Sequence, residues 1–202
     1  MDTNKYIREP AVRLFAGEFN ASKLLKKYSD DEKAPSYLIT PTGAVANRVL
    51  ISGVLVERNE KEDSRGSKWY KLKINDNTGM FTVMIGMYQP DAIREIAEIK
   101  APEFVVVIGK PSVFEGENGS LFTSLKAEDI IVCDPETRNI WTLDTAQQTL
   151  ARIVMMDELR SGREVEGIDP RAKEAVDYYK GDLKKYNEFV KKAVGNLALH
   201  TA

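Results

Sequence analysis

The sequence contains little cysteine and little histidine: Cys133 and His200 are the only ones among 202 residues. A structural zinc site needs about four cysteine or histidine ligands, so this composition excludes one, and we expect no metal site. A disulfide within the chain is excluded as well. A Ser-His-Asp or Cys-His nucleophile pair would depend on His200 near the end of the sequence, which argues against hydrolases of that class.

The sequence also lacks the motifs of nucleotide hydrolases, membrane proteins and secreted proteins. The GxxxxGK[ST] loop of nucleotide hydrolases is absent, and no apolar run comes near the ~18 residues that a membrane helix needs. The sequence shows no secretory signal pattern. No pair of carboxylates stands out as a catalytic pair. We therefore expect a cytoplasmic protein that is not an enzyme, has no catalytic residues, binds no cofactor and does not enter a membrane.

The sequence has no excess of positive charge. The 29 lysine and arginine residues are outnumbered by 31 acidic ones, which gives a net charge of −2. Within residues 44–133 there are 11 basic and 13 acidic residues. Since no bulk positive field exists, any contact with phosphate groups must depend on a local patch.

Residues 47–132 carry the pattern of a small β-barrel. Gly53 lies in the middle of the first apolar run and permits the bend that such a barrel needs. The predicted strands are residues 47–60, 68–74, 80–86, 103–115 and 120–132, with a helix at 89–100. Three strands, a helix and two strands predict a five-stranded OB-fold Greek-key barrel, with the helix between strands three and four and helices following the barrel.

The chain is predicted to have three parts. Residues 1–43 form a helical or extended segment that packs on the barrel, with one or two short helices within residues 9–28. Residues 44–133 are the OB-fold domain, and residues 134–202 are helical.

The helical part is predicted to hold helices at about 144–160 and 170–194. Asp144 or Thr145 is the expected N-cap of the first. The second has an apolar stripe of heptad spacing, and two arrangements are open for it. It folds back on the first helix, or it associates with a helix of another chain.

One side of strand 68–74 combines an aromatic residue with lysines, because alternate residues of a strand point the same way. Proteins that bind single strands combine a basic groove with aromatic side chains, and each stacked base contributes about 1–3 kcal/mol. OB folds bind such ligands on strands two and three and on the one-two and four-five loops. The predicted nucleic-acid-binding residues are Arg65, Lys68, Trp69, Lys71, Lys73, Met84, Phe114 and Phe122.

Other interpretations of these residues are open. Alternating lysines are also typical of a solvated strand face that discourages edge pairing. Trp69 could lie beneath the N-terminal segment, and Phe114 could belong to the core. Phe122 would point into the barrel if its strand were shifted by one residue. Tyr88, just before the helix, is expected to be a packing residue.

Several stretches resemble known single-strand-binding proteins. KLKINDNTGMF resembles the strand-turn-strand of replication protein A barrels, where an acidic turn closes with Thr-Gly; here Asn75 stands where the family often has aspartate. Over residues 8–155 the chain is similar to archaeal replication protein A-associated proteins. The stretches that carry this similarity are VRLFAGEFNAS, APSYLITPTGAVANRVLISGVL, TGMFTVMIGMYQPDA and TRNIWTLDTAQQTL.

The resemblance implies an OB-fold subunit that acts with archaeal replication protein A on single-stranded DNA in replication, repair or recombination. In replication protein A the helix after each barrel joins an inter-subunit helix bundle. By similarity, Thr142 to Leu159 is the candidate for contact with replication protein A subunits in a homo- or hetero-oligomer. The expected interface residues are Leu143, Ala146, Leu150, Ile153 and Val154.

Two other functions are weighed against this one. The acidic balance favours an interaction subunit of the replication protein A complex that does not itself contact DNA. An RNA-binding or tRNA-related OB module fits the barrel but not the stretches that resemble the family.

Overall fold

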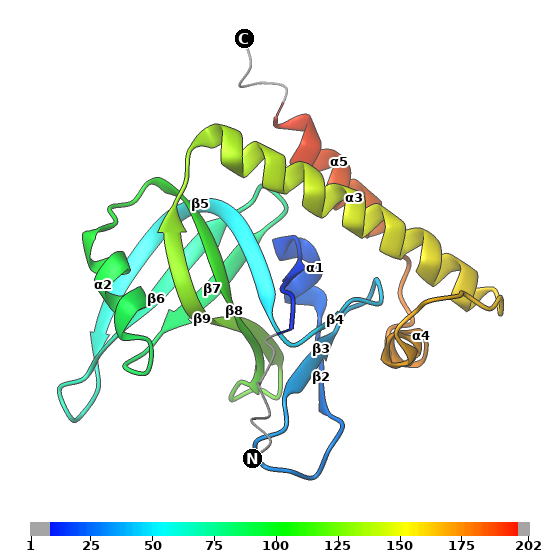
Figure 1. The fold of residues 1–202 in the computed structure, drawn as a ribbon, viewed down its shortest axis with the longest axis horizontal. Helices are drawn as coiled ribbons and strands as arrows, with labels where there is room; N and C mark the ends of the chain where they lie inside the picture. Colours follow the sequence, from blue (N-terminus) through cyan, green and yellow to red (C-terminus); the bar gives the residue numbers. More distant parts are fainter. Residues whose placement is uncertain (1–8, 198–202) are drawn as a thin grey trace, which may run out of the picture.

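The fold was analysed in a computed structural model that describes residues 9–197. Five strands of one sheet form a barrel, and β8 pairs with both β9 and β5 to close it (Figure 1). The order around the barrel is β5-β6-β7-β9-β8, and helix α2 (Pro90–Glu98) connects β7 to β8. The predicted OB-fold Greek-key barrel is confirmed. Its strands are β5 (Val49–Glu62), β6 (Lys68–Asn75), β7 (Met80–Ile85), β8 (Glu103–Glu115) and β9 (Leu121–Val132).

Strand β5 is shared by the two halves of the barrel because it bends. Its first half, Val49 to Leu55, pairs with β8, and its second half, from Val54 onward, pairs with β6. At Gly53 an added Cβ would lie 2.5 Å from the backbone oxygen of Asn75. Only glycine allows the two backbones to approach this closely, so Gly53 stands at the bend as predicted.

The barrel core is built by alternate residues of these strands. Leu72 and Ile74 of β6 and Phe81 of β7 are fully buried. Helix α2 contributes Ile96, and helix α1 (Ala16–Ala21) contributes Phe19, whose ring centroid lies 5.5 Å from that of Phe81. Helices on both sides of the barrel in Figure 1 thus complete the core that the five strands enclose.

The N-terminal segment combines one short helix with extended strands. Strand β1 (Val12–Arg13) pairs in parallel with β5 and leads into α1. Of the one or two short helices predicted within residues 9–28, α1 forms, whereas a second helix is wrong, because the next residues pair as a strand and place Leu24 opposite Ile39. The resulting antiparallel sheet contains β2 (Leu24–Lys27), β3 (Ser36–Ile39) and β4 (Val45–Ala46).

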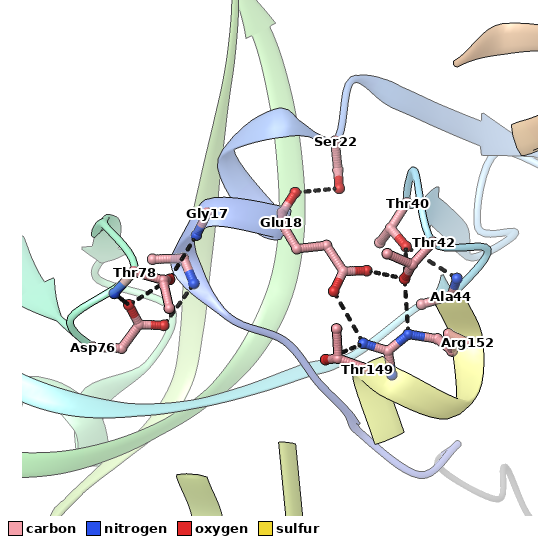
Figure 2. Close-up of polar contacts among 11 residues, drawn as sticks. Gly17, Glu18, Ser22, Thr40, Thr42, Ala44, Asp76, Thr78, Thr149 and Arg152 are labelled. Carbon is pink, nitrogen blue, oxygen red and sulfur yellow. Dashed lines mark hydrogen bonds and ion pairs between the residues drawn. The ribbon is translucent and has the colours of Figure 1, made fainter. Parts of the chain in front are cut away.

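Helix α1 is capped by the β6–β7 turn (Figure 2). The carboxylate of Asp76 accepts a hydrogen bond from the Ala16 amide at 2.6 Å, and the Thr78 hydroxyl accepts one from the Gly17 amide at 2.9 Å. The N-cap residue of α1, Phe15, has no side-chain oxygen for this task. A turn sixty residues away in sequence therefore satisfies the free amides of the helix.

A buried ion pair fixes α1 against helix α3 (Pro135–Arg160). Glu18 is 1% exposed, and its carboxylate accepts a hydrogen bond from the Arg152 guanidinium at 3.0 Å (Figure 2). Thr42 donates to the same carboxylate and accepts from Arg152. A buried charge must be paired and hydrogen-bonded, so these contacts set the position of α3 relative to α1.

Helix α3 begins at Pro135, well before the predicted start at residue 144. Asp134 is its N-cap and accepts a hydrogen bond from the Thr137 amide at 2.6 Å, and Pro135 suits the first helical position. The predicted caps, Asp144 and Thr145, are wrong because they lie inside the helix. The Thr145 hydroxyl donates instead to the Trp141 carbonyl one turn earlier, at 2.7 Å.

The single helix predicted over 170–194 is wrong. The chain forms a 3₁₀ turn (Pro170–Lys173), α4 (Glu174–Tyr178) and α5 (Lys184–Gly195). Between α4 and α5, the carbonyls of Tyr179 and Gly181 accept hydrogen bonds from Arg160 of α3, each at 2.8 Å. A continuous helix would need these carbonyls for its own bonds, and glycine weakens helix formation there. Of the two arrangements, α5 adopts the fold-back onto α3.

The side chain of Tyr179 gives a direct test of this arrangement. Its hydroxyl donates to the Ile39 carbonyl at 2.8 Å and accepts from the amides of Lys23 and Leu24. Tyr179→Phe keeps the ring but leaves these groups unpaired, so we expect the free energy of unfolding to fall by about 1–3 kcal/mol in urea denaturation. Tyr178→Phe, on a half-exposed neighbour, should change it by less than about 0.5 kcal/mol. Equal stabilities of the two variants would contradict the arrangement.

Candidate nucleic-acid interface

The outer side of β6 presents the three residues that the sequence places together. Leu72 and Ile74 point into the barrel, so alternation turns Trp69, Lys71 and Lys73 outward. Lys71 is exposed, whereas Trp69 and Lys73 are partly buried. One hydrogen-bond donor of Lys73 is already used, because its ammonium donates to the Thr82 hydroxyl of β7 at 2.9 Å.

The pairing register extends this face over three more strands. Lys71 lies opposite Met84 of β7, Met84 lies beside Lys126 of β9, and Lys126 lies opposite Lys110 of β8. These four residues are called the lysine row below. Like charges directly opposite each other destabilise a sheet, so the Lys110–Lys126 pair favours an anionic ligand. Among residues 9–197, no carboxylate lies within ion-pair distance of Lys71, Lys110 or Lys126.

Lys110 and Lys126 were not predicted from the sequence. Lys110 directly follows the apolar run of its strand, which is a usable signal, whereas Lys126 lies in a strand of mixed polarity. Their position beside Met84, however, depends on the parallel pairing of β7 with β9, which no local pattern reveals.

The rings of Phe114 and Phe122 form an aromatic surface on the β8–β9 hairpin. They lie opposite each other with centroids 5.6 Å apart and planes 25° apart, and about half of each ring residue is exposed. The alternatives that placed either ring in the core are therefore wrong. Phe114 is four residues from Lys110 on β8, so alternation puts it on the same side as the lysine row.

Two of the predicted basic residues lie apart from this row. Lys68 faces the other side of β6 and forms an ion pair with Glu60 at 2.6 Å. This hydrogen bond raises the pKa of the Lys68 ammonium and lowers the pKa of the Glu60 carboxyl. Arg65 lies in the exposed β5–β6 loop, where its backbone amide donates to Asp63. Neither residue contributes to the lysine row itself.

The loop between β7 and α2 carries an exposed aromatic residue, Tyr88. Tyr88 is 86% exposed, so the prediction of a packing residue is wrong. The Gln89 amide donates to the Gly86 carbonyl at 3.0 Å, which closes a tight turn and makes Met87 and Tyr88 protrude from it. This loop follows β7 directly after the residues that lie beside the lysine row.

The predicted partner residues on α3 are divided between two sides of the helix. Ala146 and Ile153 are wrong as interface residues, because α5 folds back over them and buries them in the chain's own core. The exposed apolar residues follow helical spacing along another side of the helix, and we call them the apolar stripe. They are Ile140, Leu143, Leu150 and Val154, with exposed Gln147 in the middle.

Metal ligands and membrane spans were also considered. Within residues 9–197, histidine, cysteine and carboxylate side chains form no group of three that could hold a metal ion. In the same part of the chain, no helix has both the length and the apolar character needed to cross a membrane.

The chain was compared with known proteins. It matches no family model and no curated protein sequence. Matching solved structures include a second single-stranded DNA-binding protein, SSBb, from Mycobacterium smegmatis, with 17% identity over 43% of this chain and 84% of that one, at a TM-score of 0.37. The mitochondrial single-stranded DNA-binding protein Rim1 from S. cerevisiae matches with 16% identity over 43% and 95% of the two chains, at 0.36.

A third match is OBody NL8, solved bound to hen egg-white lysozyme. It is 19% identical over 43% of this chain and 93% of that one, at a TM-score of 0.35. Similarity at this level does not indicate a function. The strand order and closure of the barrel decide the fold: it is an OB fold.

A charge reversal tests whether the lysine row contacts an anionic strand. In Lys126→Glu, a carboxylate replaces the ammonium beside Met84 and Lys110. We expect the affinity for an oligo-dT of about 30 nucleotides to fall about tenfold at low salt, measured by fluorescence anisotropy. Lys100→Glu makes the same charge change at an exposed site after α2 and should reduce the affinity less than about twofold. Equal losses would assign the effect to net charge rather than to the row.

Proposed function

We propose that this chain is a non-enzymatic OB-fold protein that binds single-stranded DNA and acts with replication protein A in DNA replication, repair or recombination. The observation that carries the proposal is the lysine row. It crosses four strands of the barrel and is flanked by Trp69 and by the Phe114–Phe122 pair.

The chemistry of this face suits a single strand without base preference. Lysine ammonium groups contact phosphates, while the faces of Trp69, Phe114 and Phe122 stack with bases at about 1–3 kcal/mol each. With about three phosphate contacts, the logarithm of the association constant should fall with the logarithm of salt concentration at a slope of about −2. The net negative charge of the chain adds no long-range attraction, which predicts modest affinity for the isolated protein.

The apolar stripe supports the second part of the proposal. In Figure 1, α3 extends from the barrel with α5 alongside it. The apolar residues of the stripe are exposed on α3 and are not covered by α5. Its residues are spaced by three and four, as in helices that pair with another helix. Together with the stretches that resemble replication protein A-associated proteins, this spacing favours a helix of a replication protein A subunit as the partner.

The DNA-binding part is tested by titration with oligo-dT of about 30 nucleotides across a salt series. We expect saturable binding that weakens with salt and quenches tryptophan fluorescence. Trp69→Ala should abolish most of the quenching and weaken binding by about 1–3 kcal/mol. Trp141→Phe is the matched control, because Trp141 lies on α3 and packs against Arg13 of β1. This substitution should leave the quenching and the affinity nearly unchanged. No binding at low salt would leave the interaction subunit as the function.

The partner contact is tested by substitution within the stripe. Leu143→Asp combined with Leu150→Asp should abolish co-elution with purified archaeal replication protein A, while the free energy of unfolding changes by less than about 1 kcal/mol. A charged pair at and after α2, Arg94→Asp with Lys100→Asp, lies away from α3; it is the control and should leave co-elution intact. Failure of the wild-type chain to bind replication protein A would contradict this part of the proposal.

A further inference from the structure

A small cleft lies on the outer side of the barrel where β5, the β6–β7 turn and the start of α3 meet. Its volume is about 100 Å³, enough for one small oxyanion. We call it the Arg138 cleft. Polar side chains from all three elements line it together with Gly53, Val54 and Phe104, and they are Ser52, Asn75, Asp76, Asn77, Arg138 and Thr142.

Arg138 is buried without a counter-charge. It is 7% exposed, and its guanidinium lies 5.0 Å from the centre of the Phe104 ring. Among residues 9–197, no carboxylate forms an ion pair with it, and its Nε has no hydrogen-bond partner. Burial lowers the pKa of the Arg138 guanidinium, but arginine stays charged at neutral pH. A buried, unpaired guanidinium is destabilising unless an anion approaches it.

Two further groups in the cleft are able to donate. The Ser52 hydroxyl is buried and has no partner within the described residues. The side-chain oxygen of Asn75 accepts from the Asn77 amide at 2.7 Å, which orients the Asn75 amide nitrogen as a free donor. The Thr142 hydroxyl is already used, since it donates to the Arg138 carbonyl.

The carboxylate that lines the cleft, Asp76, already accepts several hydrogen bonds from the chain. Asp76 accepts hydrogen bonds from the amides of Ala16 and Thr78 and from the Thr78 hydroxyl (Figure 2). It also accepts one from the Gly79 amide. Three of these donors bind Oδ1 and one binds Oδ2, and among residues 9–197 no hydrogen bond or ion pair joins Asp76 to Arg138. The remaining polar groups of the cleft are therefore mainly donors.

We infer that the Arg138 cleft binds a phosphate group. Arg138, Ser52 and Asn75 approach from three different elements, which suits a tetrahedral oxyanion better than a planar carboxylate. Asn75 is two residues from Lys73 on the same side of β6, so the cleft continues the face that carries the lysine row. The phosphate is either free or part of a nucleic-acid backbone, and the site does not depend on the proposed DNA binding.

Calorimetric titration of the full chain with sodium phosphate, against sodium chloride at equal ionic strength, tests the inference. We expect a single saturable site for phosphate only. Arg138→Met keeps an apolar stem over Phe104 and should weaken phosphate binding roughly tenfold or more. Ser52→Ala is a small change on the outer face of β5 and should weaken phosphate binding severalfold. It tests the site independently if Arg138→Met fails to fold. Arg94→Met is the control, because Arg94 is exposed and pairs with Asp91 on α2.

The possible results answer three questions: whether the cleft binds phosphate, whether that phosphate is free or part of DNA, and whether the chain binds DNA. No saturable heat with phosphate, or unchanged binding in both cleft variants, would overturn the inference. Binding of acetate but not phosphate would overturn it in favour of a protein carboxylate. If oligo-dT displaces phosphate, the ligand is a backbone phosphate; if both bind together, it is free phosphate. If oligo-dT does not bind but phosphate does, the site stands and the DNA-binding proposal fails.

Discussion

The parallel pairing of β7 with β9 is the contact on which the rest of the structure depends. It places Val83 beside Leu125 and Met84 beside Lys126, and it joins the two halves of the barrel. Val83 and Leu125 are fully buried, so alternation must turn Met84 and Lys126 outward. A shift of one residue would bury the Lys126 charge. The packing of the core thus also fixes the surface on which lysines from three strands meet.

A second constraint is the ion pair between Glu18 and Arg152. It lies in a buried network with Thr42 and Thr149, and it ties the N-terminal segment to α3. Losing either partner would leave a buried charge, so the network specifies one position of the helix. In that position one side of α3 belongs to the chain's own core and the other carries the apolar stripe. The surfaces proposed for DNA and for a protein partner therefore lie on different elements.

Much of the fold could be predicted because its signals are local. Alternation gave the strands around Trp69 and Lys71, and strand order around one helix gave the OB fold. The sequence also nominated Met84, Phe114 and Phe122 for the site, but not Lys110 and Lys126, since these two reach it through long-range pairing. The prediction of one long helix over residues 170–194 was wrong for a similar reason. Arg160, distant in sequence, takes the backbone carbonyls that the helix needs.

The central claim is that a single strand lies across the outer face of β6, β7, β9 and β8. The most direct measurement is the change in methionine methyl NMR signals when the chain is titrated with oligo-dT. Met84 lies in the lysine row, whereas Met156 of α3 is fully buried and serves as an internal reference. We expect a saturable shift of the Met84 signal with the Met156 signal unchanged. A shift of Met156 alone, or no shift of Met84 at saturating oligo-dT, would contradict it.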